Sequence, residues 1–119
     1  MPRSPFAFTA VLALAATAAL AETPAPITGD EIRALVSDNT VEGSMFSSGR
    51  YTEFYAADGT IRGEGYTGAW TVEADAMCFD YGEGPDCWQV GGSAEELFWI
   101  QNGEVGGTGA VVAGNPNDF

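Results

Sequence analysis

Acidic side chains are the residues of this chain whose types and spacing offer the most obvious chemistry. Three of them, Asp80, Glu83 and Asp86, lie close together in the stretch DYGEGPD. Carboxylate oxygens are ligands that Ca²⁺ prefers, so this loop is a weak candidate for a calcium site. The spacing does not match an EF-hand, however, and Asp and Gly are ordinary turn residues. We therefore favour a solvated turn, and we expect no metal ion or other cofactor.

Paired carboxylates could also act as the acid and base of a glycoside hydrolase. Glu73 with Asp75, and Glu95 with Glu96, are the pairs that the sequence offers. Each pair falls at an expected hairpin end, where exposed acidic residues are usual. A carboxylate-dependent hydrolase is therefore the least favoured of the alternatives.

The composition excludes several other kinds of active site. The chain of 119 residues has no histidine, which removes Ser-His-Asp triads, Cys-His pairs and histidine-ligated zinc. All four basic residues are arginines, so lysine nucleophiles and Schiff bases are excluded as well. The formal net charge of −13 argues against nucleic acid, whose phosphates require a basic surface. We expect a protein that is not an enzyme and that does not bind nucleic acid.

Cys78 and Cys87 are the two cysteines of the chain. Their spacing is wrong for a CxxC redox motif, and two thiols without histidine make a poor zinc site. In an oxidising compartment such a pair favours a disulfide. We expect a structural bond between Cys78 and Cys87 that contributes about 2–3 kcal/mol to stability.

The N-terminus indicates such a compartment. Arg3 precedes an apolar run over residues 6–20, which leads into the small-x-small sequence ALA. This order is typical of a secretory signal peptide, and the run is shorter than the ~20 apolar residues of a membrane-spanning helix. We therefore predict a signal peptide over residues 1–21, a periplasmic or secreted mature protein, and no transmembrane segment after cleavage.

Aromatic residues are abundant in the remaining chain, and two roles are open for them. They could line an apolar ligand pocket at the mouth of a barrel. A domain of under ~100 residues also needs large side chains to bury enough apolar area, and this favours a core role. The residues that we expect in a pocket or in the core are Trp70, Phe79, Trp88, Phe54 and Phe98.

These side chains need elements to position them, and the chain indicates one helix followed by strands. Residues 22–29 form an extended, Pro-rich leader, and Thr28 with Glu31 makes a capping box for a helix over residues 30–38. Turn signals then recur at intervals of roughly ten residues, which is typical of an antiparallel meander. We expect strands at about 40–46, 50–56, 60–65, 67–73, 76–81, 86–91, 96–101 and 104–112.

Eight short strands are enough to close a small barrel. We therefore expect a mainly-β fold, a small eight-stranded antiparallel meander or barrel preceded by one short helix. An open sandwich is the alternative. The single domain covers residues 30–114, and residues 115–119 form a C-terminal tail.

Alternation of apolar side chains predicts how the central strands pair, because successive residues of a strand face opposite sides. A tight turn at residues 74–75 brings apolar residues together on one face, and the next hairpin does the same. The predicted pairs are Trp70 with Phe79, Val72 with Met77, Met77 with Trp88, and Cys78 with Cys87 on the outer side.

Two further hairpins are expected around the dipeptides Asp58-Gly59 and Asn102-Gly103, which are typical of two-residue type I′ turns. Folding the chain about these turns pairs Phe54 with Gly63, and Phe98 with Gly107. Each ring would then lie over a cross-strand glycine, an arrangement suited to a curved sheet.

Several of these motifs together resemble a group of small periplasmic proteins of Gram-negative bacteria. The sequence TGAWTV at residues 67–72 is followed by CFDY at residues 78–81 and by CW at residues 87–88. ITGDEI at residues 27–32 matches the helix element of that group, and GNPN at residues 114–117 also fits. The resemblance covers nearly the whole mature chain, and it implies an exported protein but no particular activity.

More distantly, the layout is similar to the bacterial metalloprotease inhibitors, which are secreted eight-stranded barrels of calycin-like fold with one disulfide and a Gly-x-Trp. In that family the mature N-terminus enters the protease cleft, so the resemblance implies that residues 22–26 would have this role here.

Together these observations favour a non-enzymatic, exported binding or interaction module. We expect a monomer whose partner is a small apolar ligand or another protein. A periplasmic protease inhibitor is the alternative, followed by the hydrolase.

Overall fold

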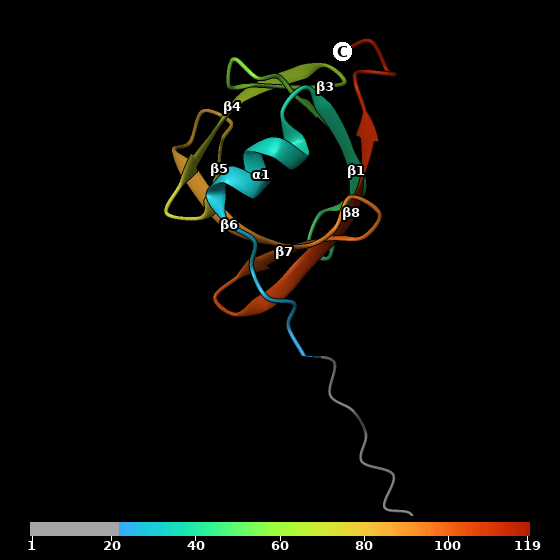
Figure 1. Ribbon diagram of the computed structural model, residues 1–119. Helices are drawn as coiled ribbons and strands as arrows, with labels where there is room; N and C mark the ends of the chain where they lie inside the picture. The colour runs from blue at the N-terminus through green and yellow to red at the C-terminus, as the bar shows by residue number, and fades with distance from the viewer. Residues whose placement is uncertain (1–21) are drawn as a thin grey trace, which may run out of the picture.

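The structure, a computed structural model, describes residues 22–119, so the expected signal peptide lies outside the described residues. Eight antiparallel strands form a closed barrel in sequence order, preceded by one helix (Figure 1). This confirms the prediction of a mainly-β barrel with one short helix. Within residues 22–119, no helix is long and apolar enough to span a membrane. The elements are α1 (Gly29–Val36), β1 (Asn39–Met45), β2 (Gly49–Tyr55), β3 (Thr60–Gly63), β4 (Tyr66–Glu73), β5 (Ala76–Asp80), β6 (Pro85–Gly92), β7 (Leu97–Gln101) and β8 (Glu104–Ala113).

The first and last strands close the barrel. β1 pairs with β8 along its whole length, from Asn39 opposite Ala113 to Met45 opposite Gly107. This pairing rules out the open sandwich.

Helix α1 covers one end of the barrel, which we call the closed end. Figure 1 shows α1 lying across the ring of strands. Its apolar stripe supplies Ile32 and Val36, both 0% exposed, to the barrel core. The Asp75 side chain, from the turn between β4 and β5, accepts a hydrogen bond of 2.7 Å from the Gly29 N–H. A two-turn helix is marginal alone, so this docking holds it in place.

The capping box predicted at the start of α1 is present, with Thr28 and Glu31 hydrogen-bonded to each other's backbone. The helix ends earlier than the expected residue 38. Ser37 is already extended, and Asp38 has a φ of 58°, which lies in the left-handed region. Asp38 then caps the next hairpin, because its side chain accepts a hydrogen bond from the Ala57 N–H.

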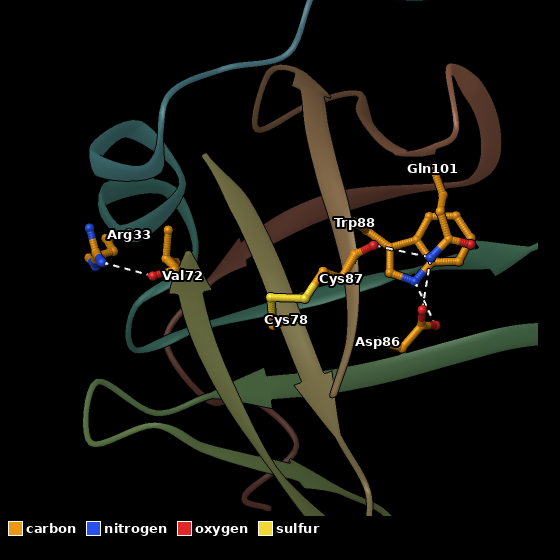
Figure 2. The surroundings of a disulfide bond; sticks show 7 residues. All are labelled: Arg33, Val72, Cys78, Asp86, Cys87, Trp88 and Gln101. Atoms are coloured by element: carbon orange, nitrogen blue, oxygen red, sulfur yellow. Dashed lines mark hydrogen bonds between the residues drawn. A yellow bond between two sulfur atoms is a disulfide. The ribbon is translucent and has the colours of Figure 1, made fainter. Parts of the chain in front are cut away.

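The central strands pair as the alternation predicted. Trp70 lies opposite Phe79, and Val72 lies opposite Met77. Cys78 faces Cys87 across β5 and β6, and the two form the predicted disulfide (Figure 2). Met77, beside Cys78 in sequence, is 0% exposed in the core and faces Trp88.

The β2–β3 hairpin differs from the prediction by one residue. Phe54 lies opposite Arg62 rather than Gly63. The Ala56 N–H donates to the Thr60 carbonyl, and the Gly59 N–H donates to the Ala56 carbonyl, so the connection has three residues instead of two. Gly59 has a φ of 95°, whereas Asp58 is not left-handed, as a type I′ turn would require.

The β7–β8 hairpin has the predicted two-residue turn, with Asn102 and Gly103 both at positive φ. A bulge between Trp99 and Ile100 then shifts the register. As a result Trp99, and not Phe98, lies opposite Gly107. The expected pairing of Phe98 with Gly107 is therefore wrong, because the irregularity lies inside the strand and not in the turn.

The leader packs on the outer wall of the barrel. Pro26 forms an isolated bridge with Gly91, and the Ile27 N–H donates to the Val90 carbonyl at 2.8 Å. Thr23 reaches the Gly103 carbonyl with its hydroxyl at 3.0 Å. The extended conformation was predicted, but the leader has a fixed place along β6.

Candidate functional site

A cavity of about 530 Å³ lies at the end of the barrel opposite α1, which we call the open end. The loops at this end join β1 to β2, β3 to β4, β5 to β6 and β7 to β8. Apolar side chains fill the closed half of the interior, so the barrel is packed at one end and hollow at the other. The cavity is lined by Met45, Ser47, Ser48, Tyr51, Glu53, Tyr55, Tyr66, Phe79, Tyr81, Glu83, Gly84, Asp86, Trp88 and Trp99.

Glu53 is the buried charged residue of this cavity, with 6% of its surface exposed. Three tyrosine hydroxyls donate hydrogen bonds to its carboxylate. Tyr55 donates to Oε1 at 2.9 Å, and Tyr66 donates to Oε2 at 2.8 Å. The Tyr81 hydroxyl lies 2.8 Å from Oε1 and 2.9 Å from Oε2. These donors replace the water that the carboxylate loses on burial.

The alternation of β2 places Glu53 in the interior. Tyr51, Glu53 and Tyr55 face inward, whereas Thr52 and Phe54 face the other side. The three-residue turn after β2 decides which set is inside, because a shift of one residue exchanges the two faces of a strand.

Tyr51 connects this cluster to the opposite wall. Its hydroxyl accepts a hydrogen bond of 2.7 Å from Trp99 Nε1 and donates one of 2.9 Å to the Thr108 carbonyl. The Trp99 ring is in turn packed edge-on against Phe79, with 5.3 Å between ring centres. The walls of the cavity are therefore held by directed contacts and not by packing alone.

Glycines make room for two of the rings. Gly63 lies opposite Tyr66, and a Cβ atom at Gly63 would collide with the Tyr66 ring. A Cβ atom at Gly106 would lie 2.7 Å from Trp88 Cζ3. A ring over a cross-strand glycine was expected for Phe54 at Gly63, but the ring found there is Tyr66. Trp88 approaches Gly106 from a strand that is not paired with β8, and Phe98 lies opposite Gly91 instead of Gly107.

All four tyrosines of the chain line the cavity, and each has a raised pKa. Burial raises the pKa of Tyr51 to about 12, with the Glu53 charge adding to the effect and the Trp99 hydrogen bond opposing it. Burial is also the largest cause of the raised pKa of Tyr55, Tyr66 and Tyr81, and the charge of Glu53 and hydrogen bonding to it add to this. The tyrosines therefore keep their protons, and Tyr55, Tyr66 and Tyr81 act as donors to Glu53.

The charges of the cavity are all of one sign. Of the lining side chains within residues 22–119, Glu53, Glu83 and Asp86 are acidic and none is basic. The one ion pair found in that part of the chain joins Arg33 to Asp30, on the helix at the closed end. The described lining of the cavity therefore carries acidic side chains and no basic one.

The five aromatic residues expected in a pocket or core have three different positions. Phe79 and Trp88 line the cavity. Trp70 is buried in the core, where its Nε1 donates to the Ala56 carbonyl at 2.9 Å. Phe54 and Phe98 are half-buried and do not line the cavity, because each alternates with inward-facing neighbours, Glu53 and Tyr55 for Phe54 and Trp99 for Phe98.

The three acids considered for a calcium site, Asp80, Glu83 and Asp86, do not come together around one point. Asp80 caps its own turn by accepting from the Gly82 N–H, and Asp86 accepts from Trp88 Nε1 and from the Gln101 amide (Figure 2). In the described part of the chain, no group of three or more Asp, Glu, Cys or His side chains could hold a metal ion. The loop is therefore a turn, with Glu83 and Asp86 at the rim of the cavity.

The acid pairs considered for hydrolysis lie away from the cavity. Glu73, Asp75, Glu95 and Glu96 are exposed in the turns of the closed end. Asp75 has a structural role there as the partner of the Gly29 N–H. The expected geometry of two acids in a cleft is not formed by these pairs.

Sequence reasoning missed Glu53, although a signal for it was present. In the stretch YTEFY, Glu53 stands two residues from Tyr51 and two from Tyr55, so the three share one face of a strand. An acid between two aromatic residues on the same face indicates a buried polar cluster. The signal was lost because the assumed turn put Phe54, and not Glu53, on the inner face. Comparisons of the chain with protein-family models, with curated proteins and with solved structures gave no match.

Proposed function

We propose that this protein is an exported, non-enzymatic binding protein that takes a small molecule into the open end of its barrel. The observation that carries the proposal is the cavity of about 530 Å³, which has the size of a small-ligand site. Its lining of aromatic rings with a few directed polar groups is typical of such sites.

Access to the cavity supports the same function. Three large hydrophobic side chains are exposed among the described residues, Phe46, Tyr66 and Tyr81, at 68%, 43% and 50% exposure. All three lie at the open end, in or beside its loops. Exposed apolar surface gathered at the mouth of a cavity is an expected feature of a site that a ligand enters.

The chemistry of the site favours binding over catalysis. Glu53 is the buried acid, and three tyrosine hydroxyls already donate to it. A general base needs a free lone pair within reach of a substrate proton. The cluster is therefore better suited to hold a ligand than to move its protons.

Export is part of the proposal. The Cys78–Cys87 disulfide suits an oxidising compartment, and the N-terminal sequence has the order of a signal peptide. Mass spectrometry of the protein recovered from the periplasm should give a chain that begins at Glu22 and lacks two thiol protons. A chain that keeps residues 1–21 would contradict export.

The binding function can be tested with the neutral fluorescent probe N-phenyl-1-naphthylamine, whose emission rises in an apolar site. We expect saturable binding to the purified protein with its disulfide intact. Ser48→Trp, in the loop at the mouth of the cavity, should weaken binding at least fivefold by blocking entry. Glu95→Trp, also at an exposed position but at the closed end, is the matched control and should leave the affinity unchanged.

Two results would overturn the proposal. One is the lack of saturable binding by a folded protein. The other is equal affinity in the wild type and in Ser48→Trp, because the probe would then bind elsewhere. Circular dichroism of each variant establishes that the barrel is formed.

The structure offers less to the protease-inhibitor hypothesis. The leader, residues 22–26, lies along the barrel wall, where Pro26 bridges to Gly91 and Pro24 approaches the same glycine. An arm that enters a protease cleft would first have to leave this place. We therefore do not propose it as the main function.

A further inference from the structure

Glu53 is a buried acid that forms no ion pair among residues 22–119. It is 6% exposed, and it lies among tyrosine hydroxyls. Burying a charge is costly even with hydrogen bonds, and proteins usually pair it with an opposite charge. Arg33 is paired with Asp30 at the closed end, and neither Arg50 nor Arg62 lines the cavity. A positively charged ligand would supply the counter-charge to Glu53 that the described residues do not provide.

The other charged side chains of the cavity also favour a positively charged ligand. Glu83 and Asp86 line it together with Glu53. Three carboxylates around one cavity repel an anion and attract a cation, and walls of low polarity strengthen this effect. The formal net charge of −13 for the whole chain acts in the same direction.

The aromatic walls suit an organic cation in particular. Seven aromatic side chains line the cavity, and Tyr51, Tyr66, Trp88 and Trp99 are among them. The face of an aromatic ring is electronegative, and it attracts an ammonium group within about 6 Å of its centre. An inorganic cation fits less well, because Ca²⁺ requires about six to eight oxygen ligands.

The hydrogen bonds of Glu53 favour a quaternary ammonium group over a primary one. Four contacts from three tyrosine hydroxyls occupy its two oxygens, two on each. A primary ammonium group has three N–H donors that need acceptors once water is removed. A quaternary ammonium group has none, so it needs only the negative potential and the ring faces.

From these observations we infer that the open cavity binds an organic cation, with a quaternary ammonium group as the preferred class. The inference rests on the proposed binding function and deepens it. The cation would lie among the aromatic rings, with Glu53 as its counter-charge beneath them. The tyrosine hydroxyls hold the Glu53 side chain in place, and the ligand would be attracted by its charge without a direct hydrogen bond.

The test compares choline with its neutral carbon isostere, 3,3-dimethylbutan-1-ol. The two probes have nearly the same shape and differ in charge. Binding to the wild-type protein can be followed by tryptophan fluorescence, because Trp88 and Trp99 line the cavity. We expect choline to bind at least tenfold more tightly than the isostere.

Glu53→Gln removes the charge and keeps the shape of the side chain. We expect the preference for choline over the isostere to fall at least fivefold in this variant. Glu73→Gln, an exposed acid at the closed end, makes the same change in net charge and should keep the preference. If Glu53→Gln does not fold, Glu83→Gln in the exposed rim loop takes its place, with an expected two- to threefold fall.

The outcomes separate the two proposals. If N-phenyl-1-naphthylamine binds but choline and its isostere bind equally or not at all, the inference fails and the binding function stands. If choline is preferred and neither Glu53→Gln nor Glu83→Gln changes the preference, the assigned counter-charge is wrong and the inference also fails. If neither the naphthylamine nor choline binds, both proposals fail.

Discussion

The closed end and the open end of this barrel differ in the side chains that face its interior, which are apolar at one end and polar or aromatic at the other. At the closed end Ile32 and Val36 from α1 are fully buried among apolar side chains. At the open end a carboxylate and four tyrosines surround a cavity. An apolar filling of that end would be the more stable choice, since replacing buried charged groups by apolar ones is often neutral or stabilising. The polar end therefore supports the proposed ligand binding, since stability alone does not require it.

We expect the largest loss of folding stability at alkaline pH, because the tyrosines of the open end then lose their protons. The pKa of each tyrosine is raised above the value near 10 that it has in the unfolded chain, to about 12 for Tyr51. The folded state holds these protons more tightly, so their contribution to stability is complete below about pH 10 and is lost as the pH rises toward 12 and above. We expect tyrosinate absorbance at 295 nm to appear together with unfolding.

The control for this titration is the protein in urea, where all tyrosines should titrate near their ordinary pKa of about 10. If a tyrosine titrates near 10 while the far-ultraviolet circular dichroism stays native, the contrast between a buried polar open end and the apolar closed end is contradicted. The open end would then be a solvated surface and not a buried polar cluster.

Truncation at the closed end should have the largest effect of any single substitution. Ile32→Ala removes a fully buried side chain and leaves a cavity between α1 and the barrel. The free energy of unfolding should fall by about 2–4 kcal/mol, measured by urea denaturation. Ala34→Gln, on the exposed side of the same helix, should change it by less than about 0.5 kcal/mol. Equal effects of the two variants would mean that α1 does not hold the closed end together.

The disulfide lies on the β5–β6 wall that both ends share. Replacing Cys78 and Cys87 together by Ser should lower the free energy of unfolding by about 2–3 kcal/mol, because the unfolded chain loses a short cross-link. The affinity for N-phenyl-1-naphthylamine should change little, since neither cysteine lines the cavity. A lost cavity in a variant that is still folded would show that the disulfide shapes the open end.

A matched pair of substitutions sharpens the comparison within the open end itself. Tyr55→Phe and Tyr66→Phe each remove one hydroxyl that donates to Glu53. Tyr55 is 1% exposed and Tyr66 is 43% exposed, so water can replace the second donor more easily than the first. We expect losses of about 1.5 kcal/mol and below about 1 kcal/mol, respectively, in urea denaturation. The reverse order would contradict the burial gradient from the floor of the cavity to its mouth.

The central part of the barrel was predictable because several local signals agree there. The apolar alternation of β4, β5 and β6 sets one inner face, and the cysteines fall opposite each other on the other face. A slip of one residue would expose Trp70 and Met77 together, so the correct register is strongly favoured. The fold class follows from the number of strands and from their spacing.

The site was less predictable because it depends on two single-residue irregularities. The Asp58-Gly59 dipeptide suits a type I′ turn, yet it lies in a three-residue connection. The Asn102-Gly103 turn has the expected form, but a bulge at Trp99/Ile100 shifts the register beyond it. In both hairpins the phenylalanine that was expected inside lies outside. Glu53 and Trp99 lie in the interior instead.

The amino-acid sequence by itself determined the strands, the capped helix, the sulfur pairing and the absence of histidine and lysine chemistry. These depend on neighbours in the chain, or on a periodicity that holds over many residues. Only the tertiary structure decided that one end of the barrel is filled and that the other is hollow. The reason is physical: a shift of one residue costs little within a turn, but the closed barrel can accept only one choice of which side chains share its interior.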